Sequence, residues 1–316
     1  MSRSGRVVRA LALAAGLCPA LVAAQSPSEG FIRTHVPDKN LCLFWPQRTY
    51  VFNYHSQGSS QTPGTAEFVA MDAAFDTWRA LSRTCSDFRF EKGPYVGVAI
   101  IGYDKASSNN TNVLVFRERA CRDVVAPGDP CLADGTCRNV YQCWDESDTT
   151  IAITTSTFSF NTGVIYDADI EFNAAPQANG ERFLFTTISS PPCDPDEQSP
   201  LCVATDVQNT LTHEIGHVIG LDHEEIPGST MEATAPLGET SKRIIDTGTA
   251  AGFCQIYPAG QPTPPCEDVD EKVLAVNRGT PGLQAVGCDA TGTRLVPWTL
   301  LFAAAFSLRR RGPPPP

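Results

Sequence analysis

Apolar residues recur at helical spacing in three parts of the chain. Between residues 65 and 81, large apolar side chains recur every three or four positions, which predicts an amphipathic helix with one side facing a core. A second helix is predicted over residues 206–221, where Asp206 is a suitable N-cap. A third is predicted over 243–258, ending before Pro258 because proline cannot continue a helix.

Other stretches have the composition and pattern of β-strands. They are residues 49–54, 95–104, 112–118, 149–159 and 163–173. The stretch YVGVAIIGYD (95–104) is almost continuously apolar, which predicts a buried central strand. The stretch GVIYDADIEFN (163–173) alternates, with Asp167, Asp169 and Glu171 on one face and apolar residues on the other. A strand that is polar on one face suits the edge of a sheet.

The first residues indicate export. Arg3, Arg6 and Arg9 precede an apolar run that ends in small residues, a pattern typical of a cleaved signal peptide over residues 1–24. The alternative, a membrane anchor, requires a longer apolar run. The formal net charge of -11 becomes still more negative without these arginines, which argues against nucleic acid or anionic lipid as the main partner.

The cysteine count fits an oxidising compartment. Twelve cysteines are present, and without Cys18 in the leader and Cys288 near the C-terminus ten remain, which predicts disulfides. We expect Cys193 and Cys202, which flank a Pro-rich loop, to pair. Four cysteines fall in residues 120–146, which we interpret as a disulfide-held surface insertion; the alternative is a second zinc site, although CxxC pairs are absent.

Three of the five histidines fall within the stretch LTHEIGHVIGLDH (211–223). His213 and His217 are four residues apart, so a helix places them on one face, about 6 Å apart along the axis. On a continued helix His223 would lie roughly 240° around from His217 and face away. Gly220 can adopt the left-handed conformation that ends a helix, and a chain reversal there would return His223 to the other two.

Three imidazoles hold zinc with one position left open, as in catalytic rather than structural zinc sites. Glu214, beside the first predicted ligand, could act as the general base that accepts a proton from water. The alternative for HExxH alone is a helix that carries these residues by chance. The additional matches at Gly220 and His223 favour the zinc site.

The stretch HEIGHVIGLDH resembles the zinc signature HExxHxxGxxH of the metzincin metalloendopeptidases, and its sequence is most similar to that of the matrixin branch. The resemblance covers roughly residues 45–258. It implies an α+β fold with a twisted, mostly parallel sheet, an antiparallel edge strand, a catalytic zinc helix and a Met-turn. It also implies His213, His217 and His223 as zinc ligands and Glu214 as the general base.

The resemblance extends to two further features. Met231 follows the last histidine at the place of the Met-turn, a tight turn beneath the zinc. In the family an extended substrate lies antiparallel to an edge strand, which we place at Ala168, Asp169, Ile170, Glu171 and Phe172.

The sequence also departs from the matrixin pattern. No PRCGxPD cysteine-switch segment is present, so we expect activity without removal of a long propeptide. Ala233 stands two residues after Met231, where some metzincins carry a zinc-binding tyrosine. The calcium-loop motif of the family is missing as well, which leaves a structural Ca²⁺ possible but undecided.

The C-terminal end has a different composition. Residues 261–286 read as a linker, and residues 287–316 contain Gly-Cys, an apolar run from Leu295 to Leu308 and an arginine cluster. This order resembles the MYXO-CTERM sorting tail of myxobacterial surface proteins. The alternative is an ordinary terminal helix.

The sequence therefore predicts an exported, monomeric zinc endopeptidase with its catalytic domain in residues 25–260. We expect one Zn²⁺, a polypeptide substrate, no nucleic acid, and membrane or cell-surface contact only through the C-terminal tail. Two alternatives remain at this stage: a surface adhesin that keeps the fold without turnover, and a zinc hydrolase that acts on another substrate.

Overall fold

The computed structural model describes residues 30–107 and 110–266, together with the backbone of residues 283–289. Its centre is a mixed sheet with the strand order β10-β5-β6-β4-β2-β3. The strands are β2 (Thr49–Tyr54), β3 (Arg89–Lys92), β4 (Asn112–Arg117), β5 (Thr150–Phe158), β6 (Ile165–Asn173) and β10 (Leu283–Asp289). β3, β2, β4 and β6 are parallel, whereas β5 is antiparallel to β6 and β10 is antiparallel to β5. The α+β class and the mostly parallel sheet are thus confirmed.

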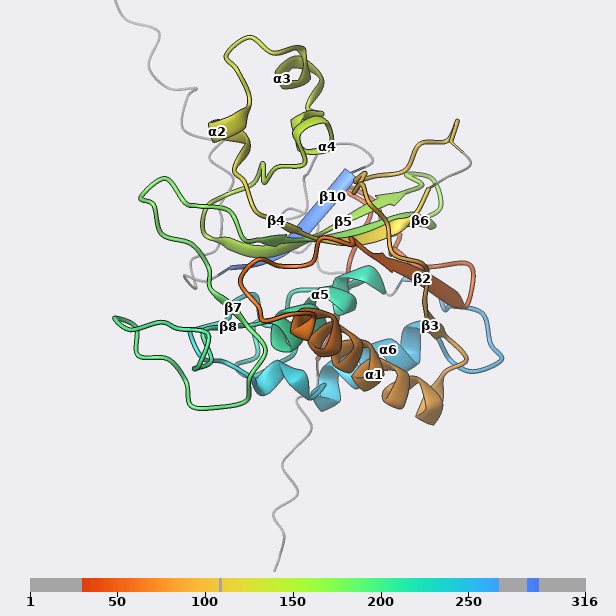
Figure 1. The fold of residues 1–316 in the computed structure, drawn as a ribbon. Coiled ribbons are helices and arrows are strands. Elements are labelled where there is room, and N and C mark those ends of the chain that lie inside the picture. Colours follow the sequence, from red (N-terminus) through yellow and green to blue (C-terminus); the bar gives the residue numbers. More distant parts are fainter. Residues whose placement is uncertain (1–29, 108–109, 267–282, 290–316) are drawn as a thin grey trace, which may run out of the picture.

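Three helices cover one face of the sheet (Figure 1). They are α1 (Ala66–Cys85), α5 (Val207–Val218) and α6 (Thr247–Ile256). The apolar stripe of α1 packs on the sheet, and the ring of Phe75 stacks on Phe52 of β2. The indole Nε1 of Trp78 donates a hydrogen bond to the carbonyl of Thr212 in α5 at 3.0 Å. The core therefore fixes α5 against both α1 and the sheet.

Short elements complete the fold. They are β1 (Ile32–Arg33), β7 (Phe185–Thr186), β8 (Thr205–Asp206), β9 (Leu221–Asp222) and the 3₁₀ turn η1 (Ser241–Arg243). β1 pairs with β9, and β7 pairs with β8.

The insertion lies on the opposite side of the sheet (Figure 1). It contains α2 (Cys121–Val124), α3 (Pro130–Asp134) and α4 (Cys137–Tyr141). Its cysteines form the disulfides Cys121–Cys143 and Cys131–Cys137, which excludes the second zinc site considered for these residues. All four cysteines of this segment are therefore disulfide-bonded.

Three more disulfides lie outside the insertion, one within a loop and two between distant parts of the chain. Cys193 pairs with Cys202, as predicted. Cys42 pairs with Cys266 and Cys85 pairs with Cys254, so both ends of the described domain are bound to its body.

The prediction of a central strand over residues 95–104 is wrong. This segment is irregular, and four of its apolar side chains are exposed: Tyr95, Val98, Ile100 and Tyr103. The backbone N–H groups of Ala99 and Ile101 donate to the side chains of Gln142 and Asn139, so the insertion satisfies this segment in place of a neighbouring strand. Two glycines in the segment also weaken its preference for a strand.

The expectation that residues 168–172 form a sheet edge is also wrong. β6 is an interior strand, since Ile170 lies opposite Leu114 of β4 on one side and Thr154 of β5 on the other. Its polar face is buried because the carboxylates bind other segments. Asp169 accepts hydrogen bonds from the N–H groups of Gly102 and Val113 at 2.7 and 2.8 Å.

Glu171 on the same face pairs with two arginines. Its carboxylate lies 2.6 Å from Nε of Arg117 and 3.1 Å from a guanidinium nitrogen of Arg138 in the insertion. The polar residues of β6 therefore bind the loop that contains Gly102 and the insertion, and they do not face solvent.

Among the described residues, no helix is long and apolar enough to cross a membrane.

Candidate metal centre

The centre is built on α5, which begins as the sequence predicts. The Asp206 side chain accepts a hydrogen bond from the N–H of Asn209 at 2.7 Å, the geometry of an N-cap. His213 and His217 lie one turn apart on this helix and are buried at 0% and 2% exposure. Burial removes them from solvent, so their orientation depends on the groups packed around them.

The helix ends just before Gly220, whose φ of +90° is left-handed as predicted. A Cβ at this position would lie 2.6 Å from the carbonyl oxygen of Leu43, so the site requires glycine for space as well as for conformation. The last carbonyls of the helix are satisfied by side chains. Nε1 of Trp45 donates to Val218, and the hydroxyl of Tyr257 donates to Ile219, at 2.8 and 3.0 Å.

The chain then reverses and is held by the N-terminal strand. β9 pairs antiparallel with β1, and the N–H of Thr34 donates to the carbonyl of Gly220 at 2.9 Å. This pairing directs His223 back toward the helix. The sequence indicated the reversal but not the strand that stabilises it.

The three imidazoles converge at their Nε2 atoms. The Nε2–Nε2 distances are 3.1 Å for His213–His217, 3.1 Å for His217–His223 and 3.3 Å for His213–His223. Three nitrogens at roughly 2.05 Å from one tetrahedral zinc ion would be about 3.3 Å apart. The predicted ligand triad is therefore assembled with the spacing that zinc requires.

Hydrogen bonds fix the tautomers of the two helical histidines. Nδ1 of His213 faces the carbonyl of Thr230 at 2.7 Å, and Nδ1 of His217 faces the carbonyl of Leu221 at 2.9 Å. A carbonyl only accepts, so each Nδ1 carries the proton and each Nε2 presents a lone pair. Lone pairs this close repel one another unless a cation lies between them, and the donor set therefore fits a metal ion.

Electrostatics keep the triad neutral. Burial lowers the pKa of His213 and of His217 well below the ordinary value, and the neighbouring imidazoles lower both further. Burial also lowers the pKa of His223. Neutral imidazole is the form that binds metal.

Met231 lies directly beneath the helix. A Cβ placed on Gly216 would collide with its Sδ, so the methionine packs against the helix between the two histidines. The preceding Thr230 supplies the carbonyl that binds His213, and its N–H donates to Asp246 at 2.7 Å. Asp246 is also the N-cap of α6, and its role was not apparent from the sequence.

Glu214 is completely buried and contacts the sheet. The hydroxyl of Thr154, in the middle of β5, lies 2.6 Å from Oε2 of Glu214 and 3.2 Å from its carbonyl oxygen. The sequence contained no signal for Thr154, because its proximity to Glu214 depends on how α5 crosses the sheet.

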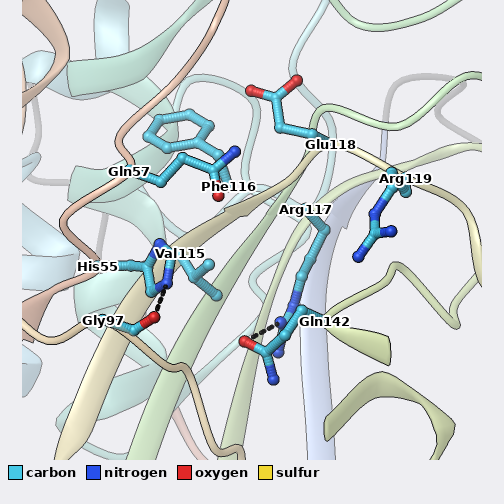
Figure 2. Close-up of a pocket in the computed structure, with 9 residues that line it drawn as sticks. All are labelled: His55, Gln57, Gly97, Val115, Phe116, Arg117, Glu118, Arg119 and Gln142. Atoms are coloured by element: carbon cyan, nitrogen blue, oxygen red, sulfur yellow. Dashed lines mark hydrogen bonds between the residues drawn. The ribbon is translucent and has the colours of Figure 1, made fainter. Parts of the chain in front are cut away.

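A separate hollow of about 210 Å³ lies at the end of β4, among residues of β4, the insertion and two loops (Figure 2). Its residues are His55, Gln57, Gly97, Val115, Phe116, Arg117, Glu118, Arg119 and Gln142. The buried guanidinium of Arg117 is bound through Nε to Glu171 and through NH1 to Gln142. None of the predicted zinc ligands lies in this hollow.

Within the described residues, one other group gathers metal-binding side chains, namely His35, Cys42 and Cys266. The two cysteines form a disulfide, so they offer no thiolates. No three acidic side chains in the described part of the chain bring their oxygen atoms within 4.8 Å of one another, so the undecided structural calcium gains no support there.

Comparison with known families agrees with this geometry. Residues 135–258 match the family model of matrixin, peptidase family M10. The match includes β5, β6, α5, the three histidines, Met231 and α6. No curated protein matches the chain. The three histidines thus hold a catalytic Zn²⁺ in a matrixin domain.

Proposed function

We propose that this protein, a zinc metallopeptidase with a matrixin domain over residues 135–258, hydrolyses peptide bonds in polypeptides that lie extended along β5. The observation that carries this proposal is the convergence of three Nε2 atoms beside a buried glutamate on the same helix. Three protein ligands argue against a purely structural zinc site, because such sites close all four zinc positions with protein ligands.

Bound zinc supplies Lewis acidity, which polarises a carbonyl and acidifies a water molecule. Glu214 accepts the proton of the attacking water and returns it to the nitrogen of the leaving amine. The hydroxyl of Thr154 binds Oε2 of Glu214 and thereby fixes the orientation of the carboxylate that carries out this transfer. Thr230 and Leu221 hold the imidazole rings through Nδ1, so the ligands need little reorganisation.

β5 is the strand that best fits an extended substrate. β5 is antiparallel to β6, only β10 lies outside it in the sheet, and its residue Thr154 contacts Glu214 directly. A substrate strand that adds to the outer edge of β5 would gain main-chain hydrogen bonds next to the catalytic helix. β5 thus replaces residues 168–172 as the proposed substrate strand.

The five disulfides and the matrixin domain suggest an extracellular protein. The signal peptide (1–24) and the sorting tail (287–316, apart from the backbone of β10) fall outside the described residues. We keep both as proposals, with a catalytic domain over 25–260. The linker predicted over 261–286 overlaps β10, which begins at Leu283. Detection of the mature chain on the cell surface, and its release when the tail is deleted, would test the anchor.

The function is tested by cleavage of casein and of a peptide library, with the products mapped by mass spectrometry. We expect internal cuts by the zinc-loaded protein, no cuts by Glu214→Ala, and loss of cutting with a chelator. Glu67→Ala is a suitable control, since Glu67 is also buried but lies in α1.

The alternatives predict different outcomes. An adhesin that keeps the fold would bind zinc at one ion per chain but cut none of the peptides. A hydrolase for other substrates would leave casein and the library intact while cleaving ester or amide reporters. Either result would contradict the proposed peptidase.

A further inference from the structure

The chain's own C-terminal strand lies on the outer edge of β5. β10 pairs antiparallel with β5 from Leu283 opposite Thr157 to Cys288 opposite Ala152, followed by an irregularity at Asp289. The pairing is therefore continuous over almost the whole of β10. Without β10, the outer backbone groups of β5 would be open to another strand.

This edge is the one closest to the catalytic helix. Val286 of β10 lies opposite Thr154, and the hydroxyl of Thr154 lies 2.6 Å from Oε2 of Glu214. Neighbouring strands are about 4.8 Å apart, so the middle of β10 runs one strand away from the residue that touches Glu214. β10 also contacts α5 itself.

We propose that β10 is an intramolecular inhibitor that occupies the strand position of a polypeptide substrate. The proposal rests on the proposed peptidase function, and it adds a means of regulating the same site. One strand edge can hydrogen-bond only one partner at a time, so substrate and β10 exclude each other. Any event that removes β10 from β5, such as cutting the chain between Cys266 and Leu283, would activate the enzyme.

The covalent connection makes this inhibition effective. Cys266 is bound to the body of the domain through its disulfide with Cys42, so β10 remains close to β5. A tethered strand with an effective concentration on the order of 1 mM and an intrinsic Kd on the order of 0.1 mM raises the apparent KM roughly tenfold. It leaves kcat unchanged, because a competitor does not alter the enzyme–substrate complex.

The first test uses the full chain with prolines in β10. Proline has no N–H, and two adjacent prolines ensure that at least one faces β5, so Val286→Pro/Gly287→Pro should prevent pairing. With a fluorogenic peptide substrate we expect a roughly tenfold lower KM at the same kcat. The matched control carries the same pair of prolines later in the sequence than Asp289, the last residue of β10, as Thr291→Pro/Gly292→Pro, and we expect it to behave as the wild type.

The second test measures binding without turnover. A fluorescein-labelled peptide with the sequence of residues 283–289, with serine in place of Cys288, is titrated with the zinc-loaded Glu214→Ala chain. We expect binding when this chain also carries the β10 prolines, and at least tenfold weaker binding when it carries the control prolines. A scrambled peptide should bind to neither.

The outcomes separate the two proposals. Cleavage with the same KM in all variants, or equal peptide binding by both chains, would overturn the inhibitory role alone. Absence of cleavage by every variant, including the β10 prolines, would overturn the peptidase function and the inhibitory role with it.

Discussion

At the scale of single residues, the catalytic glutamate depends on a neighbour from the sheet. Thr154 and Glu214 are both fully buried and joined by a 2.6 Å hydrogen bond. A buried hydrogen bond to a charged group contributes about 1.5–3 kcal/mol. The threonine hydroxyl thereby orients the carboxylate that moves the proton.

Thr154→Val removes the hydroxyl and keeps the shape of the side chain. We expect kcat to fall about tenfold or more, with KM and zinc content unchanged, because each 1.4 kcal/mol changes a rate about tenfold. Thr154→Ser should restore most of kcat. Steady-state kinetics with one peptide substrate give kcat and KM for the wild type and both variants, and metal analysis gives their zinc content. An unchanged kcat in the valine variant would contradict the orienting role.

Gly220 is a second residue on which the site depends. Gly220→Ala adds a Cβ 2.6 Å from the carbonyl of Leu43 at a φ of +90°. We expect a loss of about 2–4 kcal/mol in the free energy of unfolding and weaker zinc binding, since His223 must shift. Urea unfolding and zinc competition with a chelating dye measure the two effects.

Gly180→Ala is the matched control. Gly180 has a φ of +86°, but no atom lies within 4 Å of the position that a Cβ would take, so only the conformational cost of about 1 kcal/mol should appear. Equal losses in the two variants would show that space at Gly220 is unimportant.

The sequence predicted the ligands, Glu214 and the turn because their spacing along one helix and its end is local information. It could not predict Thr154, Trp45 or Asp246, whose roles arise from contacts between segments far apart in the chain. Spacing along the sequence carries no information on which strand crosses above a helix.

At the scale of elements, the helices agreed with prediction better than the strands did. The stripe of α1 and the N-cap of α5 are local patterns, and both were confirmed. The order of the strands in the sheet could not be predicted from such local patterns. The short connection between β5 and β6 implies that the two are antiparallel neighbours. β6 pairs with β4 on its other side and β4 pairs in turn with β2, so β5 lies on the outer side of β6.

The buried carboxylates of β6 make the sheet sensitive to pH. Burial raises the pKa of Asp167 to about 6, and burial together with Asp167 raises that of Asp169. Asp169 accepts two backbone N–H groups, so the pair is best satisfied with one shared proton. Because its folded-state pKa is raised, this pair contributes most to stability at acid pH, and its contribution decreases as the pH rises through about 6.

Asp167→Asn retains a donor for Asp169 and removes the second charge. We expect the variant to be more stable than the wild type at pH 8 by on the order of 1–3 kcal/mol, with a smaller difference at pH 4.5. Urea unfolding at the two values of pH measures this difference. A variant that is less stable at pH 8 would contradict the shared proton.

At the scale of the whole molecule, the disulfides and the sheet bring both ends of the described domain to the catalytic region. Cys42–Cys266 and Cys85–Cys254 bind the C-terminal part of the domain to its N-terminal part and to α1. β1 supports the turn that carries His223, and β10 covers the edge of β5. The N-terminal part thus completes the metal centre, while the C-terminal strand limits access to it.

The central claim is that one zinc ion, held by His213, His217 and His223, supports peptide hydrolysis. The most direct measurement is a zinc titration of the metal-free protein, with peptidase activity followed at each addition. We predict that activity rises linearly and stops rising at one zinc ion per chain, and that His223→Ala shows no such rise. Activity that is independent of zinc, or no activity at one bound zinc per chain, would contradict the account.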